Sequence, residues 1–314
     1  MVIAEGFQCE RWIHRRCVAH AARIAGPSET RLTRGSTTIL VGPRKLTEGH
    51  RTGVERDRSP LLTRQPNRLR SASPPSTLMP LRDQLLRAVP DRPESVEIRG
   101  LLLEPSTDVR GDAAGAVLFS AEFSLIALLG EPRDALILDS LRDAGDGALG
   151  GDCADGWAII ALRPHVHPAL EWTRAAIMTL RDTALLDRAF DAARACVAPL
   201  THDELARVQT AYLAELSAAH AIGTVMCARV DDQLASFAYV GFRSESYFDL
   251  SVDTIERMRG RGLAQLTAAA LIVDEQKTRG GTPVWSVIES NAPSMGAGRK
   301  LGFAEVGVVW VVEL

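Results

Sequence analysis

The segment Arg257-Met258-Arg259-Gly260-Arg261-Gly262-Leu263-Ala264 carries the strongest structural signal in this sequence. It follows a run typical of a strand and opens a helix whose apolar face holds Leu263, Leu266 and Ala270. Glycine lets a backbone approach a ligand closely, and the first N–H groups of a helix attract anions. Arginine adds mobile positive charge. The segment therefore predicts a phosphate or pyrophosphate cradle; an ordinary exposed turn is the alternative.

Two common phosphate-binding loops are excluded for this segment. A Walker A loop requires Gly-Lys-Ser/Thr, and a dinucleotide-binding loop requires Gly-x-Gly-x-x-Gly. The segment contains neither pattern.

The residues around the segment alternate between strand and helix patterns. Strands are expected at 223–230, 234–240, 247–252, 283–288 and 303–312, and helices at 262–277 and 293–301. Asp231-Asp232 is expected to form a hairpin turn. Thr201 with Glu204 predicts the start of a helix with Leu205, Val208, Tyr212 and Leu216 on one face.

The preceding residues also alternate, without a visible internal repeat. Strands are expected at 96–103, 116–119 and 157–162, an apolar run covers 123–129, and helices are expected at 133–144, 168–180 and 184–197. We therefore expect an α/β protein with an N-terminal lobe over residues 79–200 and a second lobe over residues 201–314.

Residues 1–78 differ from the rest in charge. They carry 14 basic and 6 acidic residues, a net charge of +8, whereas the remainder carries −11. Their Arg-, Ser- and Pro-rich composition predicts disorder. One interpretation is a basic arm for nucleic acid or a membrane surface. The other is a misplaced start, with Met79 as the first translated residue, because an amphipathic pattern begins there.

The sequence contains no apolar run of the ~18 residues that a membrane helix requires. The N-terminus has no apolar segment typical of a signal peptide. Five scattered cysteines favour reduced thiols over a disulfide framework. These features predict a cytoplasmic protein.

Two overlapping motifs, Arg257-x-x-Gly260-x-Gly262 and Arg259-x-x-Gly262-x-Ala264, resemble the acetyl-CoA loop of the GNAT superfamily of N-acetyltransferases. A second block resembles the family downstream, with Asn291, Ser294 and Gly302-Phe303 at the family's spacing. The two blocks span about residues 246–304, and a coarser resemblance extends over about 201–314.

The resemblance implies a mixed, mostly antiparallel sheet flanked by helices. A gap between the strands at 249–254 and 283–288 would admit the thioester. The first lobe is compatible with two-lobed members, in which a degenerate copy precedes the catalytic one.

The resemblance also implies acetyl transfer from acetyl-CoA to the amine of a small molecule or peptide, by direct attack and without a metal. A homodimer is compatible with this reading, whereas a membrane or nucleic-acid partner is not favoured. The implied acetyl-CoA-binding residues are Val252, Arg257, Arg259, Gly260, Arg261, Gly262, Leu263, Ala264, Asn291 and Ser294.

The resemblance identifies the catalytic residues less directly than the acetyl-CoA-binding residues. Many family members carry a tyrosine acid at a position that here is Gly298. The first candidate for a general base is Glu245, near the start of the strand expected at 247–252, which corresponds to the family's fourth strand. The second candidate is Glu289, beside the predicted cleft. Asp249 is a weaker candidate. Each carboxylate has a simpler explanation as a solvated or ion-paired group.

Two other classes of function remain open. Gly298 in place of the acid favours a non-catalytic acyl-CoA-binding regulatory module. The basic arm favours a protein associated with nucleic acid.

We expect a chain that begins at Met79 to match the full-length chain in thermal melting and in activity, because residues 1–78 lack core-forming residues. Melting curves and acetyl-CoA turnover of the two chains test this expectation. A large loss of either would show that the arm is part of the folded domain.

Overall fold

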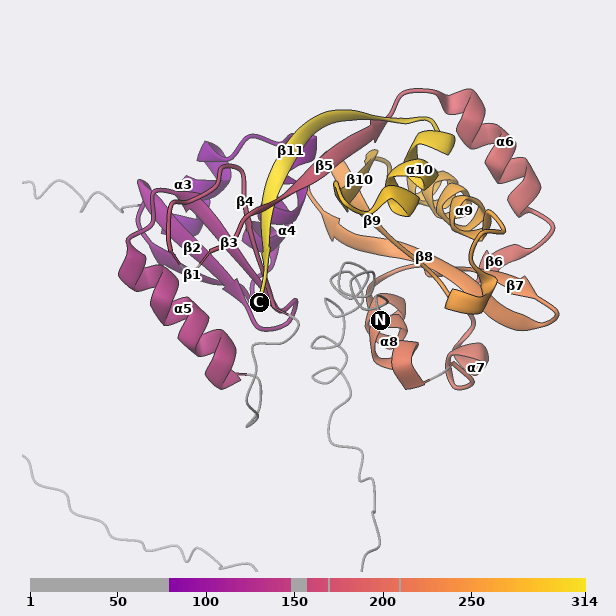
Figure 1. Ribbon diagram of the computed structural model, residues 1–314, viewed down its shortest axis with the longest axis horizontal. Coiled ribbons are helices and arrows are strands. Elements are labelled where there is room, and N and C mark those ends of the chain that lie inside the picture. The colour runs from indigo at the N-terminus through magenta and orange to yellow at the C-terminus, as the bar shows by residue number, and fades with distance from the viewer. Residues whose placement is uncertain (1–78, 148–156, 169, 209) are drawn as a thin grey trace, which may run out of the picture. The chain divides into compact units, whose positions relative to one another are not determined.

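A computed structural model describes residues 79–147, 157–168, 170–208 and 210–314, and these residues belong to one compact unit (Figure 1). The predictions for residues 1–78 concern residues outside these ranges. Within the described ranges, the strands form one mixed eleven-stranded sheet in the order β1-β2-β3-β4-β11-β5-β10-β9-β8-β7-β6.

The first half of the chain supplies one side of this sheet. Its helices are α3 (Leu81–Ala88), α4 (Val96–Leu103), α5 (Asp134–Gly147) and α6 (Thr183–Ala193), with a 3₁₀ turn, η1, at Pro93–Ser95. Its strands are β1 (Asp108–Gly111), β2 (Gly115–Ser120), β3 (Leu125–Gly130), β4 (Ala158–Ala161) and β5 (Thr173–Leu180).

The second half supplies the other side. Its strands are β6 (Val197–Pro199), β7 (Met226–Val230), β8 (Gln233–Arg243), β9 (Tyr247–Thr254), β10 (Thr282–Ile288) and β11 (Phe303–Glu313). Its helices are α7 (His202–Leu205), α8 (Thr210–Ile222), α9 (Leu263–Thr278) and α10 (Ala292–Lys300), with a 3₁₀ turn, η2, at Glu256–Met258.

The two halves repeat the same topology. β1, β2 and β3 are antiparallel neighbours, and a helix then leads to β4, which is parallel to β3. β7, β8, β9, α9 and β10 follow the same sequence of pairings. If strands β1 to β5 are exchanged in turn with strands β7 to β11, the part of the strand order that runs from β1 to β7 reads in reverse. β5 and β11 form the central pair of this symmetric arrangement. The structure therefore supports a degenerate first copy, with which the first lobe was compatible. The residues alone showed no internal repeat.

The last strand of each half is exchanged. β5 lies between β11 and β10, and β11 lies between β4 and β5, so each half inserts a strand next to the other half's fourth strand. α6 also packs on α9, and β6 pairs with β7. Residues 173–199, which we assigned to the first lobe, thus pack with the second half. The boundary at residue 200 stays a prediction.

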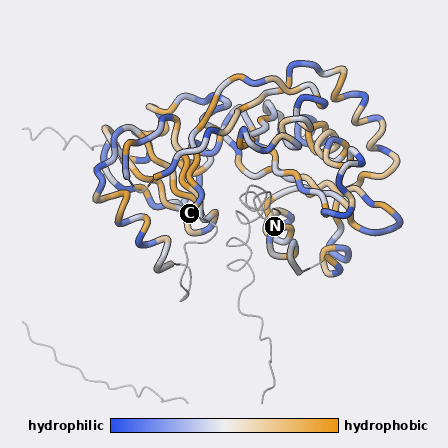
Figure 2. Tube along the Cα trace, viewed as in Figure 1, coloured by the Kyte–Doolittle hydropathy of each residue, from blue (hydrophilic) through white to orange (hydrophobic). Residues whose placement is uncertain are grey.

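Helices cover both faces of the second half. A core cluster joins α9 and α10 to one face through Ala268, Leu271, Met295 and Leu301, and a separate cluster joins α8 to the other face through Leu216. Figure 1 shows α9 and α10 on one side of β8 and α8 on the opposite side. Figure 2 shows hydrophobic residues along the strands of the first half, where Leu118, Leu125 and Ile159 are fully buried.

Three expectations about individual elements were wrong. Residues 96–103 form helix α4, not a strand, because a short run of apolar residues suits a buried helix equally well. Residues 173–180 form β5, not a helix, because both neighbouring strands hold this segment in the sheet centre. The single helix expected after Thr201 is divided into α7 and α8.

The predicted hairpin turn is confirmed. Asp231 and Asp232, between β7 and β8, both adopt positive φ angles of 50° and 60°. Two successive positive φ angles characterise a type I′ turn, which matches the twist of the strands that it joins. In the described part of the chain, no helix has both the length and the apolar character needed to cross a membrane.

We expect residues 201–314 alone not to fold cooperatively, because they lack β5, which pairs with both β10 and β11. Removing it exposes two long apolar strand edges. Thermal melting followed by circular dichroism tests this expectation, with residues 79–314 as the matched control. A cooperative transition for the shorter chain would contradict it.

Candidate functional site

The glycine-containing segment forms the turn that leads from β9 into α9. Gly260 and Gly262 have φ angles of +76° and +77°, which other residues adopt only with strain. Gly262 is the N-cap of α9, and no side chain caps this helix. The first N–H groups of α9, on Leu263 and Ala264, have no partner within the helix. An exposed helix terminus of this kind attracts an anion.

Strands β9 and β10 separate next to this turn. They pair in parallel only from Thr282 with Tyr247 to Val284 with Asp249, although β10 continues to Ile288 and β9 to Thr254. No described strand pairs with this edge of β9 beyond Asp249. The gap predicted between these strands is therefore confirmed.

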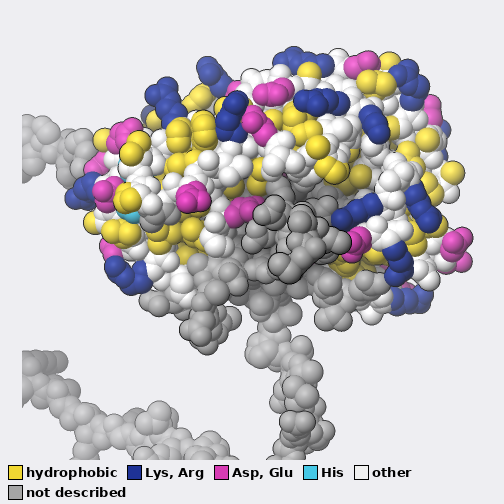
Figure 3. Space-filling view, viewed as in Figure 1, with side chains coloured by type: hydrophobic (Ala, Val, Ile, Leu, Met, Phe, Trp, Pro, Cys, Tyr) yellow, Lys and Arg dark blue, Asp and Glu magenta, His cyan; other side chains and the backbone are white. Residues whose placement is uncertain are grey.

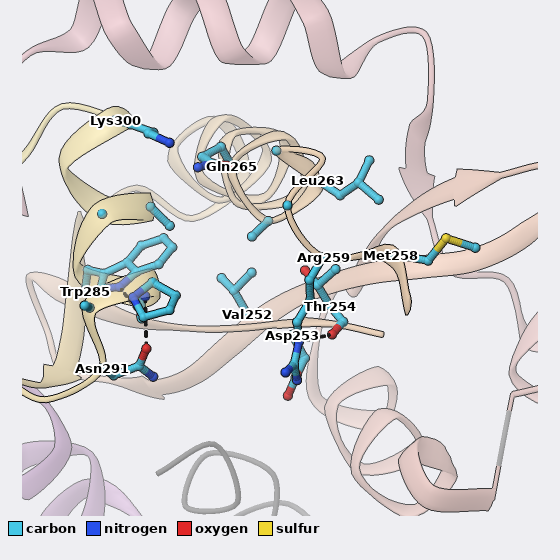
Figure 4. A pocket seen from close by; sticks show the side chains of 18 residues that line it. Val252, Asp253, Thr254, Met258, Arg259, Leu263, Gln265, Trp285, Asn291 and Lys300 are labelled. Carbon is cyan, nitrogen blue, oxygen red and sulfur yellow. Dashed lines mark hydrogen bonds between the residues drawn. The ribbon is translucent and has the colours of Figure 1, made fainter. Parts of the chain in front are cut away.

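A cavity of about 450 Å³ lies at the mouth of the gap. The end of β9, the glycine turn, the start of α9 and one face of α10 line it. In Figure 4, Trp285 and Asn291 lie across the cavity from Arg259, with Val252 between them and Lys300 beside Gln265. Two helix termini, those of α9 and α10, therefore border one cavity.

A hydrogen-bond network fixes the α10 side of the cavity. The Asn291 side chain caps α10 by accepting a hydrogen bond of 3.0 Å from the Ser294 N–H. The Trp285 indole donates a 3.1 Å hydrogen bond to the Ser294 hydroxyl. Trp285 also packs edge-on against Phe303. These contacts hold the start of α10 against β10.

Gly298, at the position of the family's tyrosine acid, is buried under Trp285. A Cβ built at Gly298 would lie 3.5 Å from the Trp285 ring and 3.5 Å from the Met178 sulfur. A Cβ at this position would therefore make ordinary van der Waals contacts with both side chains.

Most of the predicted acetyl-CoA-binding residues line this cavity. They are Val252, Arg259, Gly260, Gly262, Leu263, Ala264, Asn291 and Ser294. Arg261 is exposed and does not line it. Arg257 donates a 2.7 Å hydrogen bond to Gln233 and lines a different cavity, between α7, α8 and the β7–β8 hairpin. The structure thus favours the motif register that begins at Arg259.

Ten further lining residues were not predicted from the sequence, among them Gln265, Trp285 and Lys300. Pro293, Gly296, Ala297 and Lys300 recur at helical spacing and all line the cavity. That spacing was the available signal for Lys300, which brings a second cation to the cavity.

Glu245 lies away from this cavity, in the loop before β9, and binds Arg99 of α4. Two guanidinium hydrogen bonds, one of 2.8 Å, hold the carboxylate, and Arg99 itself is buried. This donation lowers the pKa of Glu245. A carboxylate with a lowered pKa is a weaker base. The geometry therefore supports a structural role that joins the two halves.

Glu289 and Asp249 lie at opposite sides of the gap. Glu289 follows β10 directly, is exposed, and has a 3.3 Å ion pair with Arg174 of β5. Asp249 is buried on β9 at the last pair before the strands separate.

The described residues contain no group of three or more His, Cys, Asp or Glu side chains that suits a metal ion. On the face seen in Figure 3, basic and acidic side chains are interspersed over the described surface.

Replacing Glu245 with Gln should lower the free energy of unfolding by about 0.5–2 kcal/mol at pH 7, since Arg99 loses its charged partner while Glu245 is half exposed. A lowered pKa in the fold means that the ionised carboxylate stabilises the protein above the unfolded pKa of ~4.3, and that this contribution is lost as pH falls through the folded pKa. Thermal melts of both proteins at pH 7 and at successively lower pH should therefore differ at pH 7, and the difference should shrink as pH falls below ~4.3. Equal melting temperatures at pH 7 would contradict the structural role.

Comparison with known proteins identifies the domain. The family model described as GNAT acetyltransferase matches residues 213–308, from α8 to β11. No curated protein matches the chain. A solved GCN5-related N-acetyltransferase-like protein from Streptococcus suis 89/1591 is similar, with a TM-score of 0.54 and 17% identity over 74% of this chain and 99% of that one.

Two further solved structures are similar at lower scores. A tandem GNAT protein from the clavulanic acid biosynthesis pathway has a TM-score of 0.42 and 17% identity over 74% of this chain and 94% of its own. A GCN5-related N-acetyltransferase from Kribbella flavida has a TM-score of 0.39 and 13% identity over 69% of this chain and 92% of its own.

The family match includes both the glycine turn at Gly260 and the helix cap at Asn291, which meet at one cavity. The C-terminal region of this chain contains a domain of the GNAT superfamily of acetyltransferases.

Proposed function

We propose that the protein transfers an acetyl group from acetyl-CoA to an amine. The observation that carries the proposal is the cavity at the uncapped N-terminus of α9, which opens onto the gap between β9 and β10. An elongated thioester with a charged end fits such an arrangement. The acceptor is a small molecule or a peptide, and the reaction takes place in the cytoplasm.

The glycine turn and α9 hold the pyrophosphate in this proposal. The N–H groups of Leu263 and Ala264 donate to phosphate oxygens, and the helix dipole adds favourable charge. Arg259 and Lys300 line the same cavity and supply mobile cations. A Cβ built at Gly260 meets no atom within 4 Å, so this position leaves room for a ligand.

The free edge of β9 holds the pantetheine arm. Backbone groups along Leu250–Thr254 offer hydrogen bonds to its amides, as an edge strand does to an added peptide. The thioester then lies within the gap, where the amine attacks the carbonyl carbon in a ternary complex. Alkylamines have a pKa near ~10.4, so a base must remove a proton before or during attack.

A non-catalytic acyl-CoA-binding module is the second candidate. Gly298, buried under Trp285, favours it, because the family's tyrosine acid is absent. Release of CoA from acetyl-CoA in the presence of amines distinguishes the two, because a binding module releases none.

Replacing Gly262 with Glu should lower acetyl-CoA affinity at least tenfold, because a carboxylate would enter the phosphate cradle. Gly262→Ala is the matched control, since it has the same positive φ of +77° without the charge. That φ strains either variant by about 1–2 kcal/mol. Calorimetric titration with acetyl-CoA, with melting curves to verify folding, tests this expectation. Equal affinities for the two folded variants would contradict the assignment.

A further inference from the structure

A second cavity, of about 360 Å³, lies between α7, α8 and the β7–β8 hairpin. Cavities of this size hold small ligands. Ile255 and Arg257, which lie beyond the last residue of β9, complete its lining. The described residues that line it include none from β10 and none that lines the acetyl-CoA cavity. This cavity, which we call the hairpin cavity, is therefore separate from the gap between β9 and β10.

Arg229 is one of three arginines in the described lining of the hairpin cavity, and its charge is already balanced. Its guanidinium donates hydrogen bonds of 2.6 Å and 2.7 Å to the two carboxylate oxygens of Glu204. These bonds lower the pKa of Glu204 to about 2, so the carboxylate stays ionised at neutral pH. Arg229 also donates to the carbonyl groups of Ala198, Pro199 and Cys227. Arg229 thus supports the wall of the cavity.

Arg207 and Arg257 bring further positive charge to the hairpin cavity. The Arg207 side chain is exposed and makes no hydrogen bond or ion pair with any described residue. Arg257 donates one 2.7 Å hydrogen bond from Nη2 to the Gln233 side chain, and its other N–H groups have no partner in the described ranges. Besides Glu204, the described lining contains one carboxylate, the exposed Asp232. Three arginines against two carboxylates leave a net charge of +1.

The hairpin cavity also has an apolar lining. Leu200 and Ile255 are buried, at 5% and 8% exposure. Val208, Leu234 and the ring of Tyr212 line the same cavity and are half-buried. Apolar surface gains nothing from a hydrated inorganic ion, whereas a hydrocarbon or aromatic group removes it from water. The cavity therefore suits a ligand with both a charged and an apolar part.

We infer that the hairpin cavity binds a small molecule in which a carboxylate or phosphate group is attached to an apolar body. Arg207 and Arg257 hold the oxyanion, because the planar guanidinium group matches two oxygens of a carboxylate or phosphate. The apolar residues contact the rest of the ligand. This site gives a role to Arg257, which the acetyl-CoA motif register that begins at Arg259 leaves unused. The inference does not depend on the proposed function.

Calorimetric titrations of the full chain test the inference with a matched set of probes. Phenylacetate and phenyl phosphate combine an oxyanion with an aromatic body. Phenethyl alcohol has the body without the charge, and inorganic phosphate has the charge without the body. We expect saturable binding of phenylacetate or phenyl phosphate, and the tighter of the two identifies the preferred anion. Phenethyl alcohol and inorganic phosphate should bind at least tenfold more weakly than this probe.

Arginine variants locate the bound probe. Arg207→Gln and Arg257→Gln should each lower the affinity for the tighter probe at least tenfold, because each removes a cation from the hairpin cavity. Arg188→Gln is the matched control, since Arg188 is exposed on α6 and lines neither cavity. All three substitutions replace exposed side chains, so melting curves should show the wild-type fold. Arg207→Gln should also bind acetyl-CoA with the affinity of wild type.

The inference is overturned if neither anionic probe binds wild type saturably, or if phenethyl alcohol binds as tightly as both. It is also overturned if Arg207→Gln and Arg257→Gln keep the affinity of Arg188→Gln. Loss of probe affinity in Lys300→Gln, with full affinity in Arg207→Gln, would place the probe in the acetyl-CoA cavity instead. A wild type that binds a probe as expected but has no affinity for acetyl-CoA would contradict the proposed function alone.

Discussion

The pairing of β5 with β11 at the centre of the sheet is the constraint on which the rest of the structure depends. Each strand comes from one half of the chain and lies next to the fourth strand of the other half. Eight residue pairs join β5 to β11, with a bulge between Glu305 and Gly307. Because the two halves exchange these strands, we expect neither half to complete its sheet alone and residues 79–314 to fold together.

This exchange also shapes the candidate site. β10 uses one edge for β5 from Val284 to Ile288, so it is held in the sheet while its other edge leaves β9. In an isolated half, β10 would lack that neighbour. The gap therefore depends on a strand from the first half. The same strand carries Met178, which packs near Gly298.

Contacts far from the cavity hold the two halves in register. Arg99 of α4 binds Glu245, which lies 146 residues away in sequence, and also donates to the carbonyl of Leu86 at 2.8 Å. The rings of Phe123 and Phe242 pack at a tilt of 47° with centroids 4.9 Å apart. Glu245, in the loop before β9, was a candidate base in the sequence because its partner Arg99 is distant in the chain. The ion pair supports a structural role for Glu245. Arg229 and Glu204 make a similar pair, in which hydrogen bonds from Arg229 lower the pKa of Glu204 to about 2.

The sequence by itself determined which helices and strands make up the second half. Its elements from 223 to 312 were correct in type, because Gly260, Gly262 and Asp231-Asp232 impose local backbone geometry and their neighbours have clear periodicity. It also identified eight of the residues that line the cavity, since a turn and a helix cap depend on nearby residues alone. Only the tertiary structure decided that 96–103 is a helix and 173–180 a strand, because short apolar runs fit either element until their neighbours are known. It also decided the repeat of topology, the burial of Gly298 under Trp285, and the hydrogen-bond partners of Arg257 and Glu245, because all of these depend on residues distant in the chain.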